Sequence, residues 1–179
     1  MSKGEKKKTA GILVMSYWQG KPVAVLLRRG KINHETMADE TRPGGCQITA
    51  HGGLEEGENP LKGALRELAE EIGVGAAESV MNGCQKLNMG MTIWTTTEET
   101  ETAFVTSVIV YVPDPAFVSI ASFNGSSGGF EMLTEDQVHN IKNLRDYDKV
   151  TGVRDLYTIA MFPDESALVK KGFDLIRGV

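Results

Sequence analysis

The sequence predicts an α/β domain, because runs typical of strands and runs typical of helices follow one another along one chain. Apolar and β-branched residues form runs with the length of strands. An amphipathic helix with a cap at each end is expected over residues 60–72, and another helix at about 164–177, after Pro163. The strand runs lie at residues 11–17, 23–28, 89–97 and 103–112.

The length and composition indicate one globular domain. A chain of 179 residues is long enough to bury a sizeable core. Its 41% of hydrophobic and 24% of charged residues are ordinary for such a domain. We expect that domain over residues 10–179, after a flexible basic tail over residues 1–9.

Charge and hydropathy exclude several classes of protein. The net charge of −5 argues against a duplex nucleic-acid binder, which carries a basic footprint. No apolar run approaches the roughly 20 residues that span a membrane, and residues 1–9 lack the apolar segment of a secretory signal. Cys46 and Cys84 fit a reducing compartment, with a disulfide between them as the alternative. The expected location is the cytoplasm.

The first two strand runs are expected to form a hairpin through a turn at residues 19–22. Arg28 and Arg29 close the second strand, where they either bind a substrate phosphate or only solvate the strand end. Residues 30–45 are polar and predict a long loop, a kind of segment that is often functional. A short strand is expected at residues 48–50.

The helix over residues 60–72 has a start signal and a stop signal. The side chain of Asn59 can accept a free amide hydrogen of the first turn. Pro60 stands at the first helical position, where its missing N–H costs nothing. Gly73 is expected in the left-handed conformation that ends many helices.

Two faces of this helix differ in chemistry. Glu67, Glu70 and Glu71 share the side expected to face solvent, and their like charges repel one another. Arg66, four residues before Glu70, offsets part of that repulsion. Clustered carboxylates suit Mg²⁺ or Mn²⁺, and a solvated acidic face is the alternative. The apolar stripe expected to pack against a core is Leu61, Ala64, Leu65, Leu68 and Ile72.

The runs at 89–97 and 103–112 are expected to pair as a second hairpin. Trp94 lies in the first of these strands, where it either packs in the core or stacks on a base. The expected segments that follow are a flexible loop over 124–129, a short strand over 130–133 and a capped helix over 134–142.

A longer pattern surrounds the capped helix. Read from Gly52, the chain gives glycine, five residues, Glu58, seven residues, Arg66-Glu67-Leu68, one residue, Glu70-Glu71, one residue and Gly73-Val74. This pattern resembles the Nudix box over residues 52–74, and every fixed and apolar position of that box matches.

The resemblance implies a fold and a reaction. The implied fold is the Nudix α/β/α sandwich, a mixed sheet between helices. The implied enzyme is a pyrophosphohydrolase that uses Mg²⁺ or Mn²⁺ to cleave the pyrophosphate linkage of a nucleoside diphosphate joined to another group. Its expected partner is a nucleotide-type small molecule. Binding to a membrane or to duplex nucleic acid is not expected, and assembly into a homodimer is left open.

The resemblance also implies roles for residues of the box. Glu67 and Glu71, together with Glu70, would hold the metal, and either Glu70 or Glu71 would act as the base. Glu58 would belong to the same network, and Arg66 would orient the glutamates by charge-assisted hydrogen bonds.

Further metal ligands are expected outside the helix. The backbone carbonyl of His51 corresponds to a position that often joins the metal shell in the family, while its imidazole either accepts a proton or caps a turn. An additional acidic ligand is expected from the second half of the chain. Glu131 is the candidate, with Glu98, Glu99 and Glu101 as alternatives.

Two other functions use the same resemblance. One is a Nudix-fold binding module or sensor without catalysis, and the other is an isopentenyl-diphosphate isomerase with Cys46 as the nearest candidate cysteine. An intact box favours the hydrolase over both. Residues 88–91 lack the proline seen in ADP-ribose hydrolases and the tyrosine seen in dinucleoside polyphosphate hydrolases, so the substrate is left open.

Overall fold

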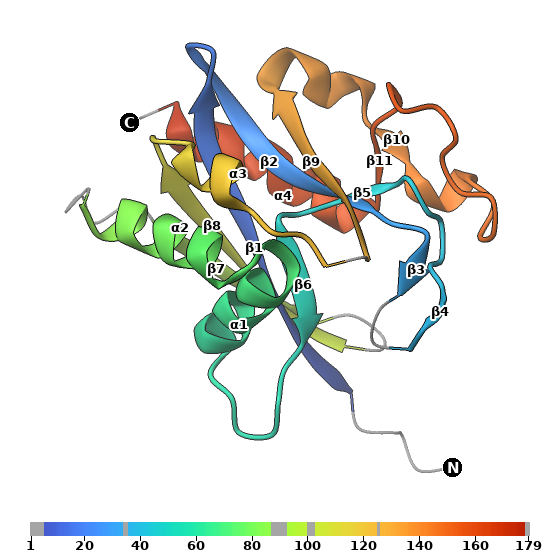
Figure 1. Cartoon of the computed structure of the whole chain (residues 1–179), viewed down its shortest axis with the longest axis horizontal. Coiled ribbons are helices and arrows are strands. Elements are labelled where there is room, and N and C mark those ends of the chain that lie inside the picture. The colour runs from blue at the N-terminus through green and yellow to red at the C-terminus, as the bar shows by residue number, and fades with distance from the viewer. Residues whose placement is uncertain (1–5, 34–35, 87–92, 100–102, 125, 178–179) are drawn as a thin grey trace.

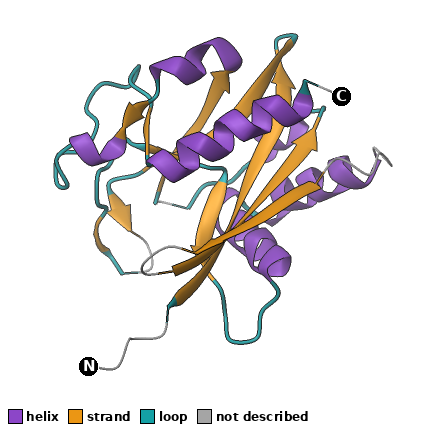
Figure 2. Cartoon of the chain, turned by 180° about the vertical axis from the view of Figure 1, so that it is seen from behind, coloured by secondary structure: helices purple, strands orange, loops and turns teal. Residues whose placement is uncertain are grey.

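The computed structural model describes residues 6–33, 36–86, 93–99, 103–124 and 126–177. Helices cover both faces of a mixed β-sheet (Figures 1 and 2). This arrangement confirms the expected α/β/α sandwich. The helices on one face are α1 (Pro60–Ile72), α2 (Val74–Lys86) and α3 (Ala116–Ile120), and α4 (Pro163–Ile176) covers the other.

Strand β1 (Lys7–Trp18) lies at the centre of the sheet. It pairs antiparallel with β2 (Lys21–Arg29) and parallel with β8 (Ala103–Val112), which pairs antiparallel with β7 (Ile93–Glu99). Both predicted hairpins are therefore confirmed. Three further strands complete the sheet: β5 (Cys46–Gln47) and β9 (Ser127–Thr134) pair with β2, and β6 (Ala50–Gly53) pairs with β1.

The side chains of β1 alternate between two hydrophobic clusters. Ile12 and Val14 belong to the cluster under α1, α2 and α3, whereas Leu13 and Met15 belong to the cluster under α4. All four are fully buried. Successive strand residues point to opposite faces, and both faces are covered here, so the strand reads as a continuous apolar run.

Several boundaries differ from the predictions. Strand β1 begins at Lys7, so residues 7–9 of the expected tail are paired with β8, and residues 1–5 lie outside the described residues. Of the strand expected at 48–50, only residue 50 lies in a strand, β6, and residues 48 and 49 connect β5 to β6. Residues 127–129, expected in a flexible loop, belong to β9.

The loop predicted over residues 30–45 contains a small hairpin of β3 (Ile32–Asn33) and β4 (Ala38–Asp39). The helix predicted over 134–142 is a shorter 3-10 segment, η1 (Glu135–Asn140), in which the Thr134 backbone N–H donates to the Gln137 side chain. The remaining short elements are β10 (Lys142–Asn143), η2 (Leu144–Asp146) and β11 (Ala160–Met161), which pairs with β10.

The sequence pattern does not predict helix α2, because Gly73 is a stop signal for the helix before it. The chain continues into α2 directly after Gly73, which has φ +87° and ψ 148° instead of left-handed helical values. A Cβ on Gly83 would lie 2.6 Å from Cγ1 of Val112, so this glycine permits close packing of α2 on β8. Such close packing is a tertiary effect that local helix propensity does not reveal.

The apolar stripe of α1 is narrower than predicted. Ala64, Leu68 and Ile72 are fully buried. Leu65 is only partly buried, and Leu61 is exposed. The helix therefore packs through three of the five predicted positions.

Both cysteines, Cys46 and Cys84, are buried free thiols, so the alternative of a disulfide between them is wrong. Within the described ranges, no helix is both long and apolar enough to cross a membrane. Residues 87–92 and 100–102 lie outside the described residues. The start of the strand expected at 89–97 and the candidate metal ligand Glu101 therefore lie outside them too.

Candidate active site

Helix α1 carries the predicted acidic residues and is anchored at both ends. The Leu61 backbone N–H donates to the Asn59 side chain at 3.0 Å, which confirms the predicted N-cap. At the other end, the Gly73 N–H donates to the carbonyl of Ala69 at 3.0 Å. The helix packs on β1 and β6, which sets its polar side at the edge of the sheet.

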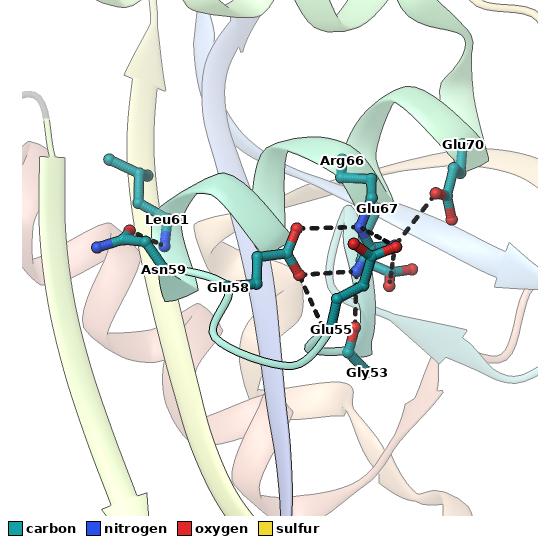
Figure 3. A network of polar contacts seen from close by, with 8 residues as sticks. All are labelled: Gly53, Glu55, Glu58, Asn59, Leu61, Arg66, Glu67 and Glu70. Carbon is teal, nitrogen blue, oxygen red and sulfur yellow. Dashed lines mark hydrogen bonds and ion pairs between the residues drawn. The ribbon is translucent and has the colours of Figure 1, made fainter.

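Arg66 connects the carboxylates of the site (Figure 3). Its Nε and Nη2 donate to the two oxygens of Glu58, each at 3.1 Å. Its Nη1 donates to Glu67 at 2.8 Å and to Glu70 at 3.1 Å. Nη2 also donates to the carbonyl of Gly53 at 2.7 Å, so one guanidinium holds three glutamates against the segment before the helix.

The charges in this network stabilise each other. The hydrogen bonds from Arg66 hold the pKa of Glu58 below its usual value. The three glutamates, Glu58 foremost, raise the pKa of Arg66 above its already high ordinary value. Charge-assisted hydrogen bonds of this kind are stronger than neutral ones, so Glu58 remains ionised and keeps Arg66 in position.

Glu67 lies directly against the backbone of Gly52. A Cβ added to Gly52 would lie 2.0 Å from the Glu67 carboxyl carbon. Only glycine leaves room for the carboxylate there. Glu67 is 7% exposed, so the prediction that all three glutamates face solvent is wrong for this residue.

Glu71 is also partly buried. It accepts a hydrogen bond from the Gln47 side chain at 3.2 Å and is hydrogen-bonded by the backbone of His51. Burial, reinforced by the negative charge of Glu67, raises the pKa of Glu71 to about 8. Glu70 alone of the three keeps about half of its side chain exposed.

These carboxylates line a cavity of about 300 Å³, termed here the acidic cavity. Within the described ranges, no group of three or more acidic, histidine or cysteine side chains is close enough together to form a complete metal-binding site. The chemistry of the lining nevertheless fits Mg²⁺ or Mn²⁺, because these ions take hard oxygen ligands and the carboxylates of Glu67 and Glu71 repel each other without a cation. The lining residues on which this depends are Glu67, Glu70, Glu71, His51, Gly52, Gln47 and Arg29.

Arg29 lies at this cavity, whereas Arg28 does not. Arg29 is ion-paired with Glu40 and donates to the Gln47 side chain at 3.1 Å. Arg28 is 7% exposed and donates through Nε and Nη2 to Glu131, at 2.9 and 2.6 Å. The structure therefore keeps Arg28 and Glu131 together in a separate pair, away from the acidic cavity.

The other candidates for an additional acidic ligand also lie elsewhere. Glu98 lines a different cavity, and Glu99 is ion-paired with Lys6 at 2.7 Å. Cys46, the candidate of the isomerase alternative, is fully buried, and burial raises the pKa of its thiol to about 12. A buried, protonated thiol is a poor catalytic group, which removes the support for that alternative.

Sequence reasoning missed Gln47 and Glu40. Gln47 orients Glu71 from β5, and Glu40 orients Arg29 from the polar loop. A single polar residue in a short strand or a loop carries no spacing pattern, so only the tertiary structure identifies them. His51 lines the cavity as expected, and burial lowers the pKa of its imidazole.

Several solved structures share this fold. An Ap4A hydrolase of C. elegans, solved as a binary complex, is 14% identical over 97% of this chain and 99% of its own, with a TM-score of 0.55. A mutT/nudix family protein from Listeria innocua is 13% identical over 96% of this chain and 94% of its own, with a TM-score of 0.56. The NUDIX domain of Shewanella oneidensis NrtR, complexed with ADP ribose, is 11% identical over 96% and 89%, with a TM-score of 0.53.

At these identities the structural similarity establishes the fold alone. No curated protein sequence matches the chain. The family model of the NUDIX domain matches residues 6–149, which include the strands of the central sheet, α1 and the acidic cavity. The chain therefore belongs to the NUDIX domain family, the family of the Nudix hydrolases.

Proposed function

We propose that the protein is a divalent-metal-dependent hydrolase that cleaves the pyrophosphate linkage of a nucleotide-type substrate. The observation that supports it best is the arrangement around Arg66, which holds Glu67 and Glu70 next to Glu71 at one cavity. Arg29, at the same cavity, adds the positive charge that a diphosphate requires.

Each residue has a distinct task in this proposal. Glu67 and Glu71, with Glu70, would hold the cation, and the backbone carbonyl of His51 would be an additional ligand. All four residues line the acidic cavity. A bound divalent cation supplies charge neutralisation at the diphosphate and lowers the pKa of the attacking water. Glu70 or Glu71 accepts the proton of that water as it adds to phosphorus and the bridging P–O bond breaks. Arg66 and Glu58 keep the carboxylates in position.

The first test is a panel of nucleoside triphosphates, nucleotide sugars, ADP-ribose, dinucleoside polyphosphates and coenzyme A. The phosphorylated products, which are nucleoside phosphates and phosphate esters as well as free phosphate or pyrophosphate, are measured with Mg²⁺, with Mn²⁺ and with a chelator. We expect metal-dependent cleavage of one class and its loss in Glu67→Gln, because the amide is a much weaker metal ligand. Glu78→Gln on α2 is the matched control, since Glu78 is exposed and does not line the acidic cavity.

Cleavage that persists undiminished in Glu67→Gln, or in the chelator, would contradict the proposed site. If folded protein binds a nucleotide of the panel but releases no product, the chain is the catalytically silent binding module instead. Binding is measured separately, on the same folded protein and with the same panel.

A further inference from the structure

A second, larger cavity lies beside the acidic cavity. Its volume is about 530 Å³, and it is bounded by β7, β8 and the first turns of α4. Arg29, Gln47 and His51 line both cavities, so a molecule bound across this boundary would reach the metal-binding carboxylates at one end. We name it the aromatic cavity, after its two lining rings, Trp94 and Phe162.

The lining of the aromatic cavity suits a flat, weakly polar ring. Trp94 and Phe162 are both partly buried and accessible from the cavity, and Ile48 and Leu168 add aliphatic surface. Nucleobases bind to proteins chiefly by stacking on aromatic side chains and by hydrogen bonds to their edges. Lys171, with its Nζ 5.6 Å from the centre of the Trp94 ring, lies at the same cavity.

Glu165 lines this cavity, and one oxygen of its carboxyl group has no hydrogen-bond partner among the described residues. Its Oε1 accepts the backbone N–H of Ile48 at 3.3 Å. Its Oε2 is hidden from solvent and has no hydrogen-bond partner among the described residues, although the side chain lines the cavity. Burial raises the pKa of Glu165 to about 7, although hydrogen bonds with the backbones of Ile48 and Phe162 act in the opposite direction. A buried polar atom without a partner calls for an explanation, and a ligand that donates to it is one.

We propose that the aromatic cavity binds the base of the nucleotide substrate and that Glu165 selects a base of the guanine type. The identification of the ligand as substrate rests on the proposed function, whereas the selection of the base rests on the cavity itself. Glu165 is thus a specificity-determining residue outside the Nudix box.

Hydrogen-bond chemistry decides the type of base. At pH values above about 7 Glu165 is ionised, and an ionised carboxylate only accepts hydrogen bonds. A second acidic side chain, Asp164, lines the cavity next to Glu165. Guanine presents a ring N–H and an amino group side by side, two donors for two carboxylates. Adenine and cytosine place an acceptor beside their amino group, and uracil flanks its ring N–H with two acceptors, so each brings a lone pair towards a negative charge.

Nucleoside monophosphates test the proposal without metal and without turnover. The chain has two tryptophans, Trp18 and Trp94. We expect GMP to quench the fluorescence of Trp94 and to bind at least about tenfold more tightly than AMP, with IMP between them because it lacks the amino group. Trp94→Phe should abolish the quench, whereas Trp18→Phe should retain it.

Glu165→Gln tests the specific acceptor. Glutamine keeps an oxygen for the Ile48 N–H but places an amide donor where the free oxygen was. The GMP preference over AMP should fall about tenfold or more, while the melting temperature shows that the fold is retained. Asp174→Asn, on the exposed side of α4, is the matched control and should keep the preference. If Glu165→Gln fails to fold, Glu165→Ala is measured in the same way.

The possible results separate this proposal from the proposed function. Equal binding of GMP and AMP, or an unchanged preference in the folded Glu165 variants, would overturn the base selection even if the enzyme hydrolyses nucleotides. Selective GMP binding by a protein that hydrolyses nothing would uphold the base selection and contradict the hydrolase.

Discussion

At the scale of single residues, the site depends on close approach between a backbone and a carboxylate. Gly52 allows Glu67 to lie against the chain, and Arg66 then fixes the same carboxylate at 2.8 Å. The two contacts act on one group from different sides. A metal ligand held in this way loses little conformational freedom when the ion binds, which favours binding.

Gly52→Ala should therefore weaken metal binding more than stability. The new Cβ would overlap the Glu67 carboxylate, which sits at the end of a flexible side chain and can move away at small cost to folding. We expect the Mg²⁺ concentration for half-maximal activity to rise by about tenfold, in line with the effect of disturbing the support of a metal ligand.

Gly53→Ala is the comparison, because nothing lies within 4 Å of a Cβ at that position. Its effect on the Mg²⁺ dependence should be much smaller. Similar Mg²⁺ curves for the two variants would show that Glu67 does not need its place beside Gly52.

At the scale of elements, one side of α1 packs in the core and the opposite side carries residues of the site. Ala64, Leu68 and Ile72 pack in the cluster under the helix, while Glu67 and Glu71 face the acidic cavity. Packing of the apolar side provides most of the stability of such a helix. The unfavourable repulsion between the glutamates can persist because the core contacts hold the helix in place.

Leu68→Ala should destabilise the protein by roughly 2–5 kcal/mol, because it leaves a cavity at a fully buried position. Leu65→Ala, on the same helix, should cost clearly less, since Leu65 is only partly buried. Denaturant unfolding of both variants measures the difference. Equal losses would mean that the two leucines are equally packed.

At the scale of the whole molecule, Arg28 joins parts of the chain that are far apart in sequence. From β2 it binds Glu131 on β9 and donates to the backbone carbonyls of Gly44, Leu156 and Thr158. It thus ties the sheet to the segment that precedes α4 and the aromatic cavity. These contacts occupy the guanidinium group of Arg28, which does not line the acidic cavity.

Arg28→Ala should lower the free energy of unfolding by up to roughly 3–5 kcal/mol, since it leaves Glu131 and several carbonyls without their donor. The partial exposure of Glu131 places the expected value towards the lower end. Arg177→Ala removes an exposed ion pair with Glu135 and should change the unfolding midpoint much less. A Michaelis constant that rises in Arg28→Ala without any loss of stability would instead indicate contact with the substrate.

Sequence patterns were sufficient to predict the mixed α/β class, the two hairpins, the bounds of α1 and the residues of the Nudix box. These features are local or periodic. Helix caps, the alternation of side chains along a strand and the fixed spacing of the glutamates can each be recognised within a short stretch of chain. The resemblance to the Nudix family comes from one such stretch, residues 52–74, and the match of the family model over residues 6–149 confirms it.

Which charged residues share a site became evident only from the folded chain. Arg28 and Arg29 are adjacent in sequence, yet one pairs with Glu131 and the other lines the acidic cavity. Helix α2 depends on close packing at Gly83, and the free oxygen of Glu165 depends on what surrounds it. Burial and partner choice arise from contacts between distant segments, and for that reason no local pattern in the sequence contains them.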